Sequence, residues 1–430
     1  MLITGRFVLC AAVAALGILI RPQWSTVALW VVVMSAVWLF DVLSALPPAT
    51  LTITRGGTTT LRAGESAMLT LTLTNPGART FAGIIRDAWP PSLPTDPSRQ
   101  SAVVRPGERR VLTTHIASTR RGSRFPDRVT VRSLGRWKLA GRQQSRRLPW
   151  RVDVLPAFSS RRHLPSKLAQ LRDLEGRSVV LHRGQGSEFD SLREYVNGDD
   201  VRSIDWRASA RVADVMVRTW RPERDRHVLI VLDCGRTSAG RVGDAPRLDA
   251  AIESTLLLTA LTQRAGDRVD VVAWDRSVRG AVSGRTGAAG IGPVTSMLAH
   301  IEPSLLETDW RGLQTEIARR SRQRSLVVLL TSLDPAPVRT GVLPMIAHLT
   351  QRHLVIVAAP NDPTIAAMAT DRSDLASTYR AAAAAGFALE RQAVSDELMR
   401  RKVEVVDALP ENLAPAVTDR YLALKAAGRL

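Results

Sequence analysis

The stretch Val228-Leu229-Ile230-Val231-Leu232-Asp233 decides the fold of the C-terminal half, because five apolar residues in a row precede a single acid. Further strand-like runs follow at 269–274, 326–330, 354–358 and 403–406, and helical stretches lie around 248–265, 294–301, 313–322, 343–351, 375–400 and 413–427. Apolar strands that alternate with helices predict a doubly wound α/β domain with a largely parallel sheet over residues 227–430. Ligands bind such sheets at the carboxyl ends of the strands, where Asp233 lies.

Acids and arginines alternate densely in the block that precedes this domain, residues 156–226. Carboxylates and guanidiniums at this density are expected to pair, often through two hydrogen bonds at once. An enzyme site built from the carboxylates and Tyr195 between Glu188 and Arg211 is the alternative, although no nucleophile or metal-ligand histidine lies nearby. The residues expected to form an ion network or docking surface are Glu188, Arg193, Glu194, Tyr195, Asp199, Asp200, Arg202, Asp205, Trp206 and Arg207.

The segment before the charged block, residues 47–155, alternates apolar residues with threonine, most clearly at 68–74. This pattern predicts a small antiparallel β-sandwich of the immunoglobulin-like kind. It carries 19 basic and 6 acidic residues, a net +13 of the chain's +19. Anionic membrane lipids are the expected partner, with Arg120, Arg121 and Arg124 as contact candidates. Nucleic acid is the rival partner, but aromatic residues for base stacking are sparse and no RNP-like or helix-turn-helix signature is present.

Two apolar runs, 7–20 and 27–40, open the chain. With their flanks, each supplies close to the roughly 20 residues needed to cross a bilayer, so residues 1–46 predict a transmembrane helical hairpin. A signal peptide is the competing interpretation, but no cleavage-type site precedes Arg21. Asp41, near the end of the second run, is expected at the membrane interface. Arg6, Arg55 and Arg62 on one side predict that both termini, and the bulk of the chain, are cytoplasmic.

The charged block also carries a family resemblance. The segments Leu192-Arg193-Glu194-Tyr195, Gly198-Asp199-Asp200 and Ile204-Asp205-Trp206-Arg207-Ala208 resemble the signature of the domain of unknown function 58, a bacterial membrane-linked family. The ending Arg420-Tyr421-Leu422-Ala423-Leu424-Lys425 is similar to that family's C-terminus, and the order of the predicted domains matches as well. The resemblance implies that the α/β domain has a von Willebrand factor type A fold.

That fold implies a metal-ion-dependent adhesion site at the strand ends, with hydroxyl and carboxylate ligands that suit Mg²⁺. Asp233, Thr237, Thr308 and Asp334 are the matching candidates. The pattern is degenerate, because Gly235 has no side chain and Ser332 stands nearest the expected aspartate. Three interpretations stay open: a weak Mg²⁺ site, a metal-free interaction surface and a site for another ligand. Asp233 alone could also be a capping acid on the helix that follows.

No P-loop, nucleophile elbow or zinc-protease motif is present in the sequence. The resemblance implies a partner, an AAA+ ATPase of the MoxR type. We therefore expect a non-enzymatic, membrane-anchored protein-interaction module that docks through the strand-end face of its α/β domain, in assembly or chaperone-like work. The alternatives are an enzyme with its site in the charged block and a basic nucleic-acid-binding protein.

Overall fold

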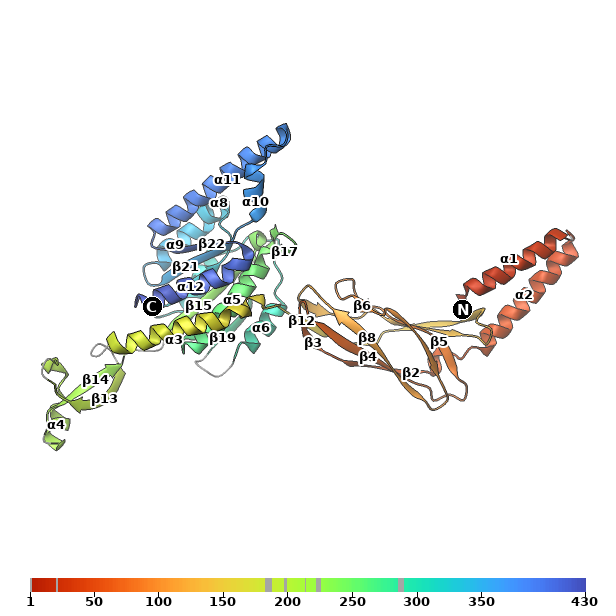
Figure 1. The fold of residues 1–430 in the computed structure, drawn as a ribbon, viewed down its shortest axis with the longest axis horizontal. Helices are drawn as coiled ribbons and strands as arrows, with labels where there is room; N and C mark the ends of the chain where they lie inside the picture. Colours follow the sequence, from red (N-terminus) through yellow and green to blue (C-terminus); the bar gives the residue numbers. More distant parts are fainter. Residues whose placement is uncertain are drawn as a thin grey trace. The chain divides into compact units, whose positions relative to one another are not determined.

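The computed structural model describes residues 2–20, 22–181, 188–196, 199–212, 214–221, 226–284 and 290–430, and within these the side chains of 175–181, 188–191 and 219–221 are not described. The chain mixes helices with several sheets and divides into two compact units, Met1–Ala157 and Phe158–Leu430 (Figure 1). The predicted α/β domain falls in the second unit, as does the charged block apart from its first two residues.

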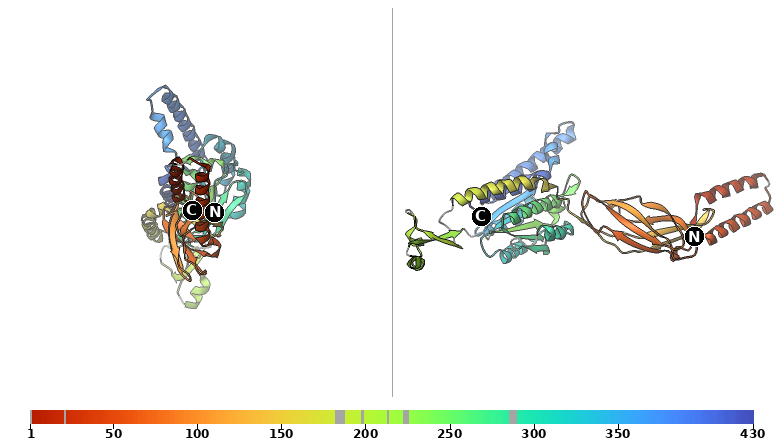
Figure 2. Two further views of the ribbon diagram at one scale, coloured as in Figure 1. Left: turned by 90° about the vertical axis from the view of Figure 1, so that its right-hand side faces the viewer. Right: turned by 60° about the horizontal axis from the view of Figure 1, so that its bottom comes forward.

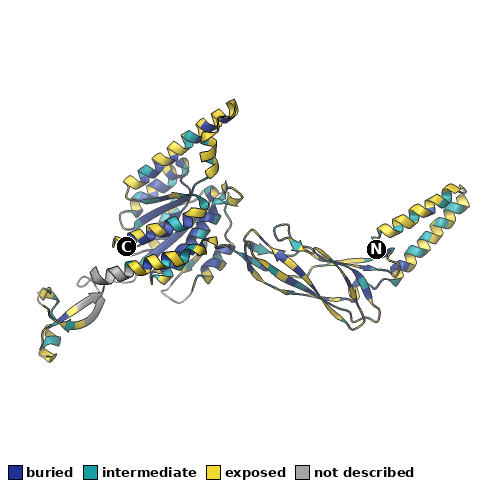
Figure 3. Cartoon of the chain, viewed as in Figure 1, coloured by how far each residue is buried: buried dark blue, intermediate teal, exposed yellow. Residues whose placement is uncertain are grey.

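The first unit begins with β1 (Leu2–Ile3) and two apolar helices, α1 (Gly5–Ile20) and α2 (Trp24–Ser44). Gly17 of α1 faces the Trp30 ring of α2, where a Cβ atom would lie 3.1 Å from Nε1. Both helices are largely exposed along their apolar faces (Figure 3). In the described part of the chain, one helical stretch, Trp24–Thr50, is long and apolar enough to cross a membrane, with a mean hydropathy of 2.1, whereas Gly5–Ile20 is a shorter apolar helix.

Three sheets form the rest of the first unit, in the orders β1-β11-β10-β5-β7, β2-β4-β8-β6 and β3-β12-β9. The alternation predicted from the sequence is plain in β4, whose leucines at 69, 71 and 73 are buried while its threonines are half-buried. The remaining elements are η1 (Pro48–Thr50), β2 (Thr52–Gly57), β3 (Thr60–Arg62), β4 (Ser66–Thr74), β5 (Phe81–Asp87), β6 (Thr95–Asp96), β7 (Arg99–Val104), β8 (Arg109–Ala117), β9 (Gly122–Arg124), β10 (Val129–Leu134), β11 (Ala140–Arg146) and β12 (Val152–Leu155).

The second unit is built on a six-stranded sheet with the order β19-β18-β15-β20-β21-β22. The five strands predicted from the sequence lie side by side and parallel, and β19 adds an antiparallel edge. The strands are β15 (His227–Asp233), β18 (Arg268–Trp274), β19 (Val278–Ser283), β20 (Leu326–Leu330), β21 (Leu354–Pro360) and β22 (Glu404–Ala408).

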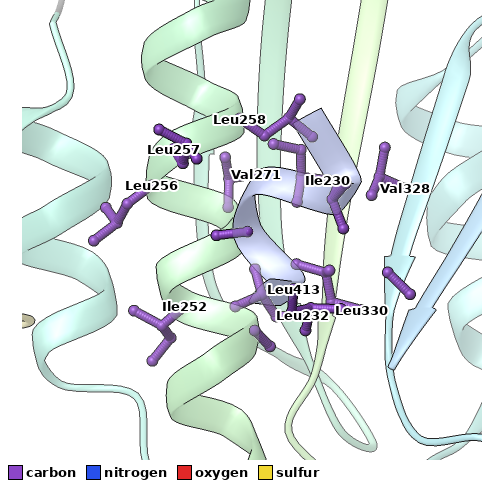
Figure 4. Close-up of a cluster of buried hydrophobic side chains, with 14 of the residues drawn as sticks. Ile230, Leu232, Ile252, Leu256, Leu257, Leu258, Val271, Val328, Leu330 and Leu413 are labelled. Carbon is purple, nitrogen blue, oxygen red and sulfur yellow. The ribbon is translucent and has the colours of Figure 1, made fainter. Parts of the chain in front are cut away.

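Helices cover both faces of this sheet (Figures 1 and 2). One buried cluster joins the sheet to α3, α5 and α12, and Figure 4 shows Ile230 and Leu232 of β15 among leucines of α5. A second cluster joins the other face to α7, α9 and α11. The helices are η2 (Ser159–His163), α3 (Leu164–Leu181), η4 (Arg236–Ala239), α5 (Arg247–Arg264), α6 (Gly292–Ala299), α7 (Trp310–Arg320), α8 (Pro335–Pro337), η5 (Val338–Val342), α9 (Leu343–Leu349), α10 (Pro363–Thr370), α11 (Leu375–Arg400) and α12 (Pro410–Ala426).

The signature segment forms a small substructure of its own. Strands β13 (Glu188–Glu194) and β14 (Met216–Arg221) pair as an antiparallel ladder. Between them lie η3 (Val201–Ser203) and α4 (Trp206–Val212). A second short ladder, β16 (Arg241–Val242) with β17 (Ala245–Pro246), precedes α5.

Candidate functional site at the strand ends

Asp233 ends β15 at the carboxyl edge of the sheet and is 1% exposed. Its carboxylate accepts four hydrogen bonds. At Oδ1 the donors are the Gly235 amide at 2.9 Å and the Thr308 hydroxyl at 2.6 Å. At Oδ2 they are the hydroxyls of Thr331 at 2.6 Å and Thr237 at 3.2 Å. A buried carboxylate is tolerated when donors surround it in this way. Because the donors come from separate segments of the chain, Asp233 holds the site together.

Gly235 makes this arrangement possible. A Cβ atom at this position would lie 2.0 Å from the Thr308 hydroxyl oxygen and 3.1 Å from Asp233 Oδ1. The hydroxyl of Thr308 therefore fills the space into which a side chain at position 235 would project. Thr308 can occupy this position only because residue 235, where the expected pattern has a serine, is a glycine.

Asp334, the fourth metal-ligand candidate, does not contact Asp233 but pairs with arginine side chains. Its Oδ2 lies 2.6 Å from Nη1 of Arg247 at the start of α5, and its Oδ1 lies 4.0 Å from Nη1 of Arg391 on α11. Arg391 also donates two hydrogen bonds, at 2.8 and 2.9 Å, to Asp407 in β22. The structure thus brings Asp233, Thr237 and Thr308 together, while Asp334 belongs to an arginine–carboxylate network.

These residues do not fit a Mg²⁺ site. Mg²⁺ needs near-octahedral oxygen ligands, but each carboxylate oxygen of Asp233 already accepts two hydrogen bonds. The guanidinium of Arg247 neutralises Asp334, the other carboxylate among the four candidates. The buried Ser332 hydroxyl, which has no hydrogen-bond partner among the described residues, adds an oxygen but no charge. Within the described residues, no three His, Cys, Asp or Glu side chains gather where they could hold a metal ion.

Cys234, next to Asp233, is also unsuited to chemistry. Burial raises the pKa of its thiol to about 12, and the neighbouring Asp233 charge adds to the effect. The thiolate is the nucleophilic form, so this cysteine is inert near neutral pH. Its role is packing beneath the strand ends.

Two features of this face were not anticipated from the sequence. Thr331, the first residue after β20, was not among the candidates, although a hydroxyl directly after a buried strand was a usable signal. The loop before α7 exposes two apolar side chains, Leu305 at 79% and Leu306 at 54%. The Leu306 carbonyl accepts the Arg236 amide at 2.8 Å, which ties this loop to the turn after Asp233.

Replacing Gly235 by serine, which brings the sequence closer to the metal-site pattern, is expected to destabilise the protein. The new side chain displaces the Thr308 hydroxyl, and overpacking of this kind costs about 1–3 kcal/mol. Urea unfolding of the full chain in mild detergent measures the change. Gly292→Ser is the matched control, because Gly292 is exposed with open space around it. Equal stability of the two variants would contradict the packing account.

Two carboxylates of the signature segment form ion pairs within it. Arg193 donates two hydrogen bonds to Asp199, at 2.7 and 2.5 Å. Asp205 accepts the amides of Arg207 and Ala208 at the start of α4, and its other oxygen accepts from Arg218 at 2.8 Å.

These contacts decide what the carboxylates can do. The hydrogen bonds from Arg193 lower the pKa of Asp199, and those from the Ala208 amide and Arg218 lower the pKa of Asp205. A general acid needs a raised pKa, so the surroundings of these two carboxyls do not favour that role.

The other signature candidates are not drawn into one site. Glu194, Arg202, Trp206 and Arg207 are exposed, Tyr195 is half-buried, and Asp200 accepts the Arg202 amide at 2.9 Å. Only the backbone of Glu188 is described, and it pairs with Arg221.

The arginine cluster of the sandwich lies around β9. The Arg124 guanidinium folds back onto the chain and donates to the carbonyl oxygens of Arg120 at 3.3 Å and Arg121 at 2.9 Å. Part of the cluster's hydrogen-bonding capacity is thus used to hold its own loop.

Comparison with known proteins locates the family signal in the second unit. The chain is 25% identical, over 193 residues, to an uncharacterised protein of Mycobacterium bovis and to one of Mycobacterium tuberculosis. The match covers 44% of this chain and 60% of each relative. A solved structure, the CARDB domain of a Pyrococcus furiosus protein, is 16% identical over 24% of this chain and 86% of its own, but the TM-score of 0.17 supports no argument. Residues 191–371, which include the signature segment and Asp233, match the family described as "Protein of unknown function DUF58".

Proposed function

We propose that the chain is a non-enzymatic, membrane-anchored docking module that binds an AAA+ ATPase of the MoxR type. The docking surface is the strand-end face of the α/β unit, which has a von Willebrand factor type A architecture. Helices α1 and α2 together form the anchor as a transmembrane hairpin, and the bulk of the chain lies in the cytoplasm. The partner, the architecture and the topology come from the family resemblance and from the distribution of arginines near the helices.

The observation that carries the proposal is the exposed pair Leu305 and Leu306 beside the Asp233 network. Surface leucines that protrude together are candidates for burial in a partner. Arg236 and Glu307, paired at 2.6 Å and both exposed, border them with charge of both signs. Apolar side chains with a polar rim are the usual anatomy of a protein–protein interface. The hydrogen bonds to Asp233 hold the loop beneath them in one conformation, which lowers the entropic cost of binding.

The test replaces the two leucines. Leu305→Ser with Leu306→Ser is expected to weaken binding of the MoxR-type ATPase at least about tenfold, since truncation of interface anchors commonly costs more than about 1 kcal/mol each. Biolayer interferometry between the full-length chain in nanodiscs and the ATPase from the same cell, with ATP present, measures the dissociation constant.

The matched control is Leu389→Ser, because Leu389 on α11 is also 73% exposed but lies on a different element. Its affinity is expected to equal that of the wild type. If the control weakens binding as much as the loop variant, or if the loop variant binds normally, the strand-end face is not the docking surface.

A further inference from the structure

The end of α2 is locked into the sandwich by a buried carboxylate. Asp41, expected at the interface, is 0% exposed and accepts three backbone amides: that of Trp137 at 2.8 Å, and those of Leu139 and Ala140 at 2.7 Å. The Phe40 ring packs against Trp137 with centroids 4.7 Å apart. The loop 135–140 is therefore fixed to the last turns of the apolar helix.

This loop marks one end of the sandwich. The Arg79 guanidinium, just after β4, donates to the Leu43 carbonyl of α2 at 3.3 Å. β4 runs from Thr74 at this end to Ser66 at the other, where Ser66 pairs with Ala117 shortly before the Arg120 cluster. Nine residues of strand span about 26 Å. The arginines first selected as lipid contacts thus lie at the sandwich end remote from the apolar helices.

Cationic side chains surround the helix end instead. Arg6, Arg79, Arg136 and Lys138 are all exposed, and we call them the collar. Arg6 belongs here because β1 pairs with β11 and the Thr4 hydroxyl donates to the carbonyls of Lys138 and Leu139 at 2.8 Å. Trp137, half exposed, sits within the collar.

We propose that the collar binds the phosphate groups of anionic phospholipids, with Trp137 at the level of the headgroups. The proposal rests on the membrane anchor proposed above. Basic residues directly beside a membrane segment are attracted to anionic lipid, and the attraction fades within a Debye length of about 8 Å at physiological salt. Tryptophan is the aromatic residue that prefers the membrane interface. The collar meets both conditions, whereas the Arg120 cluster lies several Debye lengths away along β4.

The test compares two variants that remove equal charge. The full-length chain is reconstituted into vesicles of equal parts phosphatidylcholine and phosphatidylglycerol, extracted in mild detergent, and the ratio of the two lipids that co-purify is measured by mass spectrometry. Arg79→Gln with Arg136→Gln and Lys138→Asn is expected to lower the phosphatidylglycerol enrichment by about threefold or more. Asparagine is used at position 138 because Lys138 has a φ of 60°, which asparagine tolerates.

The control variant, Arg120→Gln with Arg121→Gln and Arg124→Gln, is expected to keep the wild-type enrichment. Arg136→Gln with Lys138→Asn alone, which leaves the Arg79 contact to α2 intact, is expected to lose part of it. Unchanged enrichment in the collar variants, or an equal loss in the control, would overturn the proposal. Carbonate extraction distinguishes failure of the membrane anchor from failure of the collar. If alkali releases the wild type from the vesicles, the anchor proposal is wrong and the collar proposal fails with it.

Discussion

Asp233→Ala is expected to lower the free energy of unfolding by about 2–6 kcal/mol, because it leaves two buried donors, the Gly235 amide and the Thr331 hydroxyl, without an acceptor at about 1–3 kcal/mol each. Four donors converge on this carboxylate, and two of them, the hydroxyls of Thr308 and Thr331, bind at 2.6 Å. Urea unfolding of the full-length chain in detergent, followed by circular dichroism, measures the loss. Asp233→Asn retains one carbonyl oxygen and the side-chain volume, and is expected to lose less.

The same experiment separates the metal-free interpretation from the Mg²⁺ site. A ligand that binds the folded state raises its stability with concentration. We expect millimolar Mg²⁺ to leave the unfolding free energy of the wild type unchanged, because Arg247 neutralises Asp334 and four donors already occupy the oxygens of Asp233. Stabilisation by Mg²⁺ that Asp233→Ala abolishes would show that the metal interpretation is right. If Asp233→Ala leaves the unfolding free energy unchanged, this residue does not organise the site.

The second large effect is expected at the C-terminal helix. Asp267, 3% exposed, accepts a hydrogen bond from the Tyr421 hydroxyl and pairs with Lys425 Nζ at 3.1 Å. Asp267→Ala removes the counter-charge of a buried ammonium, and breaking a buried pair in this way costs about 3–5 kcal/mol. Through Tyr421 and Lys425, Asp267 holds α12 against the connection between α5 and β18.

A surface pair serves as the control for this prediction. Glu397 and Arg401 on α11 are one turn apart and 3.0 Å from each other, and both are solvent-accessible. Glu397→Ala is expected to cost only about 0.3–0.5 kcal/mol in the same unfolding assay. If Asp267→Ala costs no more than Glu397→Ala, the buried pair does not hold α12 in place.

The sheet of the second unit was predictable because its strands are buried on both faces and read as continuous apolar runs. Strand β19 was not predicted. It is an edge strand whose side chains are exposed or half-buried, so its sequence contains no continuous apolar run. Asp233 was found because an acid directly after a buried strand stands at the carboxyl edge of the sheet. The family pattern supplied Thr237 and Thr308, which also reach Asp233.

The remainder of the site depends on packing between distant segments. Nothing at positions 247 or 391 indicates locally that their guanidiniums approach Asp334, since 87 and 57 residues separate the partners. The dependence of Gly235 on Thr308 is equally invisible, because it arises from a contact between two loops. The position of Asp41 near the end of an apolar run predicts the membrane interface, and its amide partners, 96 to 99 residues away, have no local signature that indicates otherwise.

The most direct test of the account is a crosslinked purification of the full-length chain from its native membranes in the presence of ATP. We expect an AAA+ ATPase of the MoxR type to be recovered, with crosslinks to the residues around Leu305 and Leu306. Recovery of the chain without such an ATPase, or with crosslinks confined to other faces of the α/β unit, would contradict it.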